Sequence, residues 1–225
     1  MQLLPDISID QKLKAASPNL TLGVVCSSVT VSKYDSSLWR EIEHQSVKIN
    51  SQINIEAISD ILQFKELRSL YRSLGKDPTR YRGSAEALIR RVLQGKGLYK
   101  INTIVDINNL VSLETFHSVG SYNLAKLNPP ITFRIGKLGE SYKGIGKDNI
   151  NIADLPVFAD QLGPFGSPTS DSERAMVIPD TKQIMMMIIS CTGLQNLSKQ
   201  LHRVANLLSM YAHAPKEKIQ IYVVD

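Results

Sequence analysis

Apolar residues recur at intervals of three and four positions in five segments of the chain, the spacing of amphipathic helices. The first of these helices is expected to begin at Ser36 or Ser37, where a hydroxyl can cap it. A second cap is expected at Ser84, ahead of an apolar stripe that Gly95 closes. The other four predicted helices span residues 58–74, 84–95, 103–116 and 194–211.

Shorter apolar runs that are rich in β-branched residues predict strands in the remainder of the chain. They cover residues 20–26, 131–135, 157–160, 175–178, 184–190 and 219–224. Glycine and proline punctuate residues 136–172, so we expect long loops there. Because helices dominate the first half and strands the second, the pattern indicates a mixed α/β (α+β) fold, a sheet flanked by helices. We expect one domain of residues 1–225.

Composition limits the functional classes without choosing among them. Of the 225 residues, 43% are hydrophobic and 21% are charged, the balance of an ordinary globular protein. The net charge of +5 permits a polyanionic partner such as RNA but does not require one. Pro5, Asp6 and Asp10 interrupt the start where a secretory leader would be apolar, and no apolar run approaches the roughly 20 residues of a membrane span. We therefore expect a cytoplasmic protein without membrane contact.

Metal and cofactor signatures are weak along the whole chain. Cys26 and Cys191 both lie in apolar runs, where thiols usually pack in the core, and neither has CxxC or other ligand spacing. Residues 136–147 are rich in glycine and lysine but lack the spacing of a P-loop. We therefore expect no metal and no cofactor.

Cationic side chains gather in residues 76–83 (KDPTRYRG) and in the helix predicted to follow. The candidates for RNA contact are Arg80, Arg82, Arg90 and Arg91, with Lys96 and Lys100 beyond them. Tyr81 would add an aromatic ring on which a base can stack. The alternative is that Tyr81 packs in the core while the arginines cap helices or pair with Glu86. The sequence leaves both interpretations open.

The stretch INTIVDINNLVSLETFHSVGSYNLAKL (residues 101–127) fits a pattern that recurs in one known family. The fitting positions are Ile101, Asn102, Val105, Asp106, Asn109, Leu113, Glu114, Lys126 and Leu127. Farther along, GPFGSPTSDSERAMVIPDTKQIMMMI (residues 163–188) fits the same family at Gly163, Gly166, Val177 and Thr181. Over about residues 67–188 the chain thus resembles the B3/B4 tRNA-editing domain of the phenylalanyl-tRNA synthetase β subunit.

The resemblance implies a pocket that accepts a wrongly attached tyrosine and hydrolyses its ester bond to tRNA. Carried over position by position, the pocket asparagine falls on Asn109 and the two glycines fall on Gly163 and Gly166. The family histidine falls on Gly120 and the glutamate falls near Met187, so both functional groups are missing here. A carboxylate at that place would pair with a phenolic hydroxyl, so we expect that this pocket does not hold tyrosine by that contact.

Neighbouring residues are candidates for replacing the missing groups. His117 lies three positions before Gly120, and residues 120–122, with Ser121 and Tyr122, can offer backbone N–H groups to a carbonyl or an oxyanion. The expected rim of the pocket adds Phe165, Ser167 and Ser172.

Two further interpretations concern backbone and loop geometry. Gly163 and Gly166 either form a turn or allow a close approach of the backbone to a ligand. Asp106 is expected to be structural and to fix a neighbouring loop.

The resemblance implies a free-standing editing-type domain that binds tRNA or aminoacyl-tRNA and deacylates a mischarged ester. A positioned water and backbone donors would carry such a reaction, which suits a chain with no Ser/His/Asp or Cys/His constellation. The alternatives are a binding module for a small amino-acid-like or nucleoside ligand, without turnover, and an RNA-binding accessory protein. The chain is too short for a complete synthetase and has no ATP-handling motif. Whether hydrolysis survives, and which oligomer forms, stay open.

Overall fold

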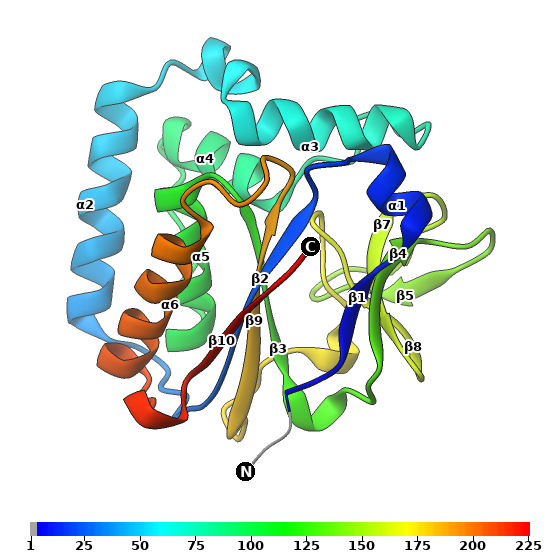
Figure 1. Cartoon of the computed structure of the whole chain (residues 1–225). Helices are drawn as coiled ribbons and strands as arrows, with labels where there is room; N and C mark the ends of the chain where they lie inside the picture. Colours follow the sequence, from blue (N-terminus) through cyan, green and yellow to red (C-terminus); the bar gives the residue numbers. More distant parts are fainter. Residues whose placement is uncertain (1–3) are drawn as a thin grey trace.

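Three layers make up the computed structural model, which describes residues 4–225 (Figure 1). Helices form the first layer, a central four-stranded sheet the second, and another four-stranded sheet the third. The central sheet has the order β10–β2–β9–β3, and each neighbouring pair is antiparallel. Its strands are β10 (Gln220–Val224), β2 (Thr21–Ser28), β9 (Gln183–Ser190) and β3 (Ser118–Asn123).

The second sheet packs against the face of the central sheet that the helices leave uncovered. Its order is β1–β4–β7–β8, with β1 parallel to β4 and the other pairs antiparallel. Its strands are β1 (Ile7–Ile9), β4 (Ile131–Ile135), β7 (Pro156–Asp160) and β8 (Gly163–Gly166). Between β4 and β7 the chain forms a two-stranded ribbon, β5 (Ser141–Lys143) with β6 (Asn149–Asn151). The short helix α1 (Gln11–Ala16) leads from β1 to β2.

Four helices pack on the other face of the central sheet, and α3 runs across one end of the layers (Figure 1). The helices are α2 (Ser36–Gln52), α3 (Leu62–Ser73), α4 (Ser84–Leu93), α5 (Thr103–Thr115) and α6 (Leu197–Tyr211). Short 3₁₀ turns lie between elements: η1 (Ile55–Asp60), η2 (Leu124–Lys126), η3 (Glu173–Ala175) and η4 (Lys216–Lys218). Within residues 4–225, no helix combines the length and apolarity needed to cross a membrane.

Strand β9 contributes side chains to the cores on both faces of the central sheet. Successive side chains of a strand point to opposite faces. Met186 and Ile188 therefore join the core under the helices, while Met185 and Met187 join the core between the two sheets. Because both faces of β9 are buried, its sequence is continuously apolar instead of alternating. The mixed α/β fold expected from the sequence is confirmed.

Several local expectations are wrong in detail. Asp35, and not Ser36 or Ser37, caps α2, because its carboxylate accepts hydrogen bonds from the N–H groups of Ser37 and Leu38. Helix α4 begins at Ser84 after Gly83, and no side chain caps it. The helix predicted over residues 58–74 is split into η1 and α3, and α6 starts three residues later than residue 194.

The strand predicted over residues 175–178 does not form, and strands β1, β3, β5, β6 and β8 were not predicted. Ala175 ends η3, and the hydroxyl of Thr181 accepts a hydrogen bond from the N–H of Ile178, so a loop uses the donor that a sheet would need. Strands β3 and β8 contain glycine and polar residues and lack an apolar run. Both lie where the family resemblance placed the pocket.

Candidate functional site

The two segments that resemble the editing family meet between the sheets. In the β3–β9 pair, Gly120 lies directly opposite Met187, so the positions of the family's histidine and glutamate face the same side. The ring of Tyr122, two residues along β3, packs edge-on against Phe165 of β8, with 4.9 Å between ring centroids. Both expected halves of the pocket therefore converge on Tyr122.

Tyr122 fills the space between two glycines. A Cβ atom added at Gly120 would lie 2.3 Å from the Tyr122 hydroxyl oxygen, and one added at Gly166 would lie at the same distance. Carbon and oxygen atoms that are not bonded cannot approach so closely, so both positions must be glycine while the ring stays in place. Tyr122 and Met187 are both fully buried, so the Tyr122 side chain occupies the position between the two glycines.

The hydroxyl of Tyr122 finds its partner within the chain. It donates a hydrogen bond of 2.8 Å to Oδ1 of Asp171, which also accepts from the N–H of Ser167 at 3.3 Å. Burial raises the pKa of Asp171 to about 7, although the hydrogen bonds from Tyr122 and Ser167 act in the opposite direction. Burial also raises the pKa of Tyr122 well above its usual range, so the phenol keeps its proton at neutral pH.

The loop that carries Asp171 is held by its own hydroxyl groups. Ser167 Oγ donates to the carbonyl oxygen of Ser170 (2.8 Å) and accepts from its N–H (3.1 Å). Ser172 Oγ accepts from the N–H of Arg174, and the Tyr142 hydroxyl donates to the carbonyl oxygen of Ser170 at 2.6 Å. Ser167 and Ser172, both expected at the pocket rim, are buried, and their hydroxyls serve this loop instead.

Gly163 and Gly166 are glycines for different reasons. Gly163 has a φ of +112°, a conformation that side chains disfavour, and its carbonyl oxygen accepts from Arg174 Nη2 at 2.9 Å. It therefore serves the turn between β7 and β8, as one of the two interpretations predicted. Gly166 instead allows a close approach, but the group that approaches is Tyr122 and not a ligand.

A polar cluster lies on the other face of β3. Ser121 Oγ donates to Oδ1 of Asn108 on α5 at 2.8 Å, and both residues are half-buried. Asn109, the asparagine singled out by the resemblance, is the next residue on the helix and is also half-buried. Because β3 is an edge strand of the central sheet, alternate backbone N–H groups along it face away from β9. Polar side chains and backbone donors thus coincide here.

His117 does not take the place of the missing histidine. It lies three residues from Gly120 along the chain entering β3, about 10 Å away. Its side chain is only 3% exposed, and burial lowers its pKa to about 4. The imidazole is therefore neutral at physiological pH and packs in the interior. Asp106, by contrast, is structural as expected, because it accepts from Trp39 Nε1 at 2.7 Å and from the N–H of Ile101 at 3.3 Å.

The predicted basic edge is partly neutralised. Glu86 on α4 is 2% exposed and accepts from Arg68 Nη2 (2.6 Å) and Arg90 Nε (2.8 Å), while Arg82 Nε lies 3.4 Å away. Burial alone would raise the pKa of Glu86, but these arginines hold it below its usual value. Arg82 and Arg90, two of the four candidates for RNA contact, thus pair with Glu86, as the alternative interpretation held. Arg80 remains exposed.

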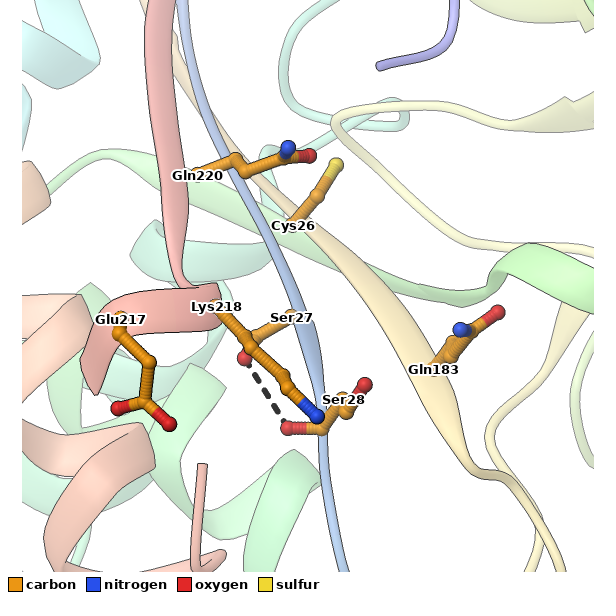
Figure 2. A pocket seen from close by; sticks show the side chains of 7 residues that line it. All are labelled: Cys26, Ser27, Ser28, Gln183, Glu217, Lys218 and Gln220. Atoms are coloured by element: carbon orange, nitrogen blue, oxygen red, sulfur yellow. Dashed lines mark hydrogen bonds between the residues drawn. The ribbon is translucent and has the colours of Figure 1, made fainter. Parts of the chain in front are cut away.

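A separate cavity of about 320 Å³ opens at one end of the central sheet (Figure 2). It is lined by Cys26, Ser27, Ser28, Gln183, Glu217, Lys218 and Gln220. Burial raises the pKa of Cys26 to about 12, so this thiol is not a nucleophile at neutral pH. Ser27 Oγ donates to the carbonyl oxygen of Ser28 at 3.0 Å. Because the Cys26 thiol stays protonated and the Ser27 hydroxyl donates to the backbone, we assign the cavity no catalytic role.

Comparison with solved structures identifies the architecture. The chain is similar to an N-terminal fragment of the phenylalanyl-tRNA synthetase β subunit from Pyrococcus horikoshii, with a TM-score of 0.50 over 98% of this chain and 54% of that one. The identity is 14%, so this likeness concerns the fold.

Sequence comparison adds the family. The phenylalanine–tRNA ligase β subunit of Chromobacterium violaceum is 34% identical over 80 residues, which is 35% of this chain and 10% of that protein. The chain thus spans only about a tenth of the length of that curated relative. The model of the B3/4 domain matches residues 66–210, well over half of the chain. The chain belongs to the B3/4 domain family.

Proposed function

We propose that this protein is a free-standing editing-type domain that binds the aminoacylated end of a tRNA and deacylates a mischarged ester. The observation that carries the proposal is the convergence of the two family segments at Gly120, Met187 and Gly166. On the other face of β3, Ser121 bonds to Asn108, the residue before Asn109 on α5. The similar proteins named above are β subunits of a synthetase that charges tRNA with phenylalanine. A cytoplasmic location belongs to this proposal, because charged tRNA is found there.

The proposal takes the chain as one domain. The family match covers residues 66–210, but β2 and β10, which lie outside it, pair with each other and complete the central sheet. Strand β2 also pairs with β9 along its whole length. The matched segment therefore depends on both ends of the chain, and we treat residues 1–225 as one unit.

The chemistry would rest on positioning. Hydrolysis of an aminoacyl ester needs a water aimed at the carbonyl carbon and donors for the charge that develops on the carbonyl oxygen. The half-buried Asn109 side chain on α5 and the outward N–H groups of edge strand β3 are the proposed donors, whereas the Ser121 hydroxyl already donates to Asn108. His117 is neutral and buried, and the thiols of Cys26 and Cys191 have pKa values near 12, so none of these is assigned a catalytic role.

The amino acid removed is not expected to be held by the carboxylate–phenol contact of the family. Tyr122 occupies the space between Gly120 and Gly166, and Asp171 already binds its hydroxyl. A substrate side chain must therefore lie outside the interior between the sheets, against the face of β3 that carries Ser121. The mischarged amino acid is consequently selected by contacts other than the carboxylate–phenol pair of the family.

Deacylation of a panel of radiolabelled aminoacyl-tRNAs, correct and mischarged, tests the proposal. We expect selective release from one member, and Asn109→Ala should slow that release by ~10-fold or more if Asn109 positions the carbonyl. Asn149→Ala, at an exposed asparagine of β6, is the matched control and should act like wild type. Release from no member would rule out the hydrolase.

A non-catalytic binding module is the second candidate. It is favoured by one observation, the replacement of the family's histidine and glutamate by Gly120 and Met187, neither of which can exchange a proton through its side chain. In that case an amino-acid-like or nucleoside ligand should bind saturably by calorimetry, with little dependence on salt, and Asn109→Ala should weaken it. Binding that disappears as salt rises would instead indicate contacts to a polyanion.

A further inference from the structure

A second group of cations escapes neutralisation and lies beside exposed aromatic rings. It consists of Lys33, Tyr34, Arg91, Lys96, Tyr99 and Lys100, which we call the basic aromatic patch. The patch is continuous, because the Arg91 guanidinium lies 4.1 Å from the centroid of the Tyr99 ring and Lys100 Nζ lies 4.8 Å from that of Tyr34. Tyr99 is 66% exposed and Tyr34 48%, unlike the buried Tyr71 and Tyr122.

The backbone beneath the patch is firmly anchored. Asp106 accepts hydrogen bonds from Trp39 and from the N–H of Ile101, which fixes the segment that carries Tyr99 and Lys100. Thr103 at the start of α5 donates its N–H to the carbonyl oxygen of Ser32 (2.9 Å) and accepts from the Ser32 N–H (3.1 Å). The two loops are thereby held together, so the rings and cations form a preorganised surface.

One carboxyl acts on the patch: burial raises the pKa of Asp106, and the charge of Lys100 opposes that rise. The carboxylate of Asp35 accepts from the N–H groups of Ser37 and Leu38 at the start of α2, and the Asp106 carboxyl is buried and shared between Trp39 and Ile101. Lys33, Lys96 and Lys100 are exposed, and Arg91 is half-buried. Arg82 and Arg90 differ, because Glu86 lies against them.

We infer that the basic aromatic patch binds single-stranded RNA. Bases stack on Tyr34 and Tyr99, and Lys33, Lys96 and Lys100 contact phosphates, which is how single strands are held without sequence readout. Asn102 caps α5 next to the patch, and Asn109 lies seven residues along that helix, about 10 Å away. A strand on the patch can therefore reach the polar cluster within two or three nucleotides. The inference rests on the proposed function only in taking RNA as the partner.

Fluorescence anisotropy with a 12-nucleotide single-stranded RNA ending in CCA tests the inference. The double variant Tyr34→Ala/Tyr99→Ala should weaken binding by at least about tenfold, since each stacked base contributes several-fold. Lys96→Ala/Lys100→Ala should lower the slope of log Kd against log salt by about one to two. Leu138→Ala and Lys147→Ala are the controls, because both residues are exposed on other loops, and they should bind like wild type.

Competitors separate RNA from other polyanions. Single-stranded RNA should compete better than duplex RNA of the same length and far better than polyglutamate, which offers charge without bases. Equal competition by polyglutamate, or unchanged RNA affinity in both double variants, would overturn the inference. Deacylation is scored separately: if the wild-type protein fails to bind single-stranded RNA but still deacylates a short aminoacyl-minihelix, the patch inference alone is overturned. Intact RNA binding without deacylation sinks only the hydrolase.

Discussion

Tyrosines have opposite environments in two regions of the molecule. Between the sheets, Tyr122 is fully buried and its hydroxyl is bound by Asp171. On the basic aromatic patch, Tyr34 and Tyr99 are exposed and lie beside cations. The first region satisfies its polar atoms internally, while the second presents exposed rings together with cations. The positions that the resemblance assigns to a pocket are thus occupied in this chain by one of its own side chains.

The largest expected effect on stability comes from a substitution between the two sheets, next to Tyr122. Gly166→Ala places a methyl group 2.3 Å from the Tyr122 hydroxyl and 2.7 Å from Asp171 Oδ1. We expect a loss of about 3 kcal/mol in the free energy of unfolding, measured by urea denaturation, because buried groups cannot move aside. The double variant with Tyr122→Phe should lose less than the sum of the two single variants, since the closest atom is gone. Additive losses would show that Tyr122 does not lie between the glycines.

The pH dependence of stability tests the buried pair next. The folded pKa of Asp171, about 7, lies above its ordinary value of 3.8, so its contribution is full below pH 4 and is lost as the pH rises to 7. Asp171→Asn should remove this loss. Relative to wild type, its unfolding free energy should improve by roughly 1–3 kcal/mol between pH 4 and pH 7. A difference that stays constant across this range would contradict the raised pKa.

His117 should act in the opposite direction. Its folded pKa of about 4 lies below the ordinary 6.5, so its contribution is full above pH 6.5 and is lost as the pH falls to 4. His117→Gln should therefore flatten the acid limb of the stability profile, by roughly 1–3 kcal/mol in denaturation across this range. His202→Gln, at an exposed histidine, should leave the acid limb unchanged. An unaltered acid limb in His117→Gln would mean that the imidazole is not buried in its neutral form.

The smallest expected effect is on RNA affinity, when single cations of the basic aromatic patch are replaced. Lys100→Ala should weaken binding of single-stranded RNA about threefold, because one phosphate contact is lost. Arg90→Ala should change it less than twofold, because Glu86 already neutralises that guanidinium. Anisotropy titrations at equal salt give both values. A reversed order would mean that the arginines around Glu86, and not the patch, contact RNA.

Sequence patterns were sufficient for the elements with strong periodicity. Helices α4 and α5, and the apolar run of β9, were predicted close to their observed bounds because each is set by its own residues. Strand β3 could not be found this way, because Ser121 bonds across to Asn108 and Gly120 makes room for Tyr122, and both needs are tertiary.

Some features of the candidate site could likewise be predicted from the sequence, and others could not. The alignment of Gly120 and Met187 with the missing groups followed from the sequence, and their direct pairing in the sheet agrees with it. The bond from Tyr122 to Asp171, 49 positions later, left no sequence signal. The neutralised edge did leave one, because Arg82, Glu86 and Arg90 lie at successive four-residue intervals along one helical face.

The central position of β2 also constrains how the chain folds during synthesis. Its Leu22 pairs with Ile189 and its Val24 with Tyr222, so its neighbours in the sheet are translated long after it. Helices α2 to α5 can form early, yet β2 must wait as an apolar strand with unpaired edges until the last tenth of the chain emerges. Pairing between strands so far apart in the sequence slows folding. Until it occurs, the apolar strand β2 is exposed and prone to aggregation. Ribosome-bound chains that stop before β9 should therefore be retained by chaperones.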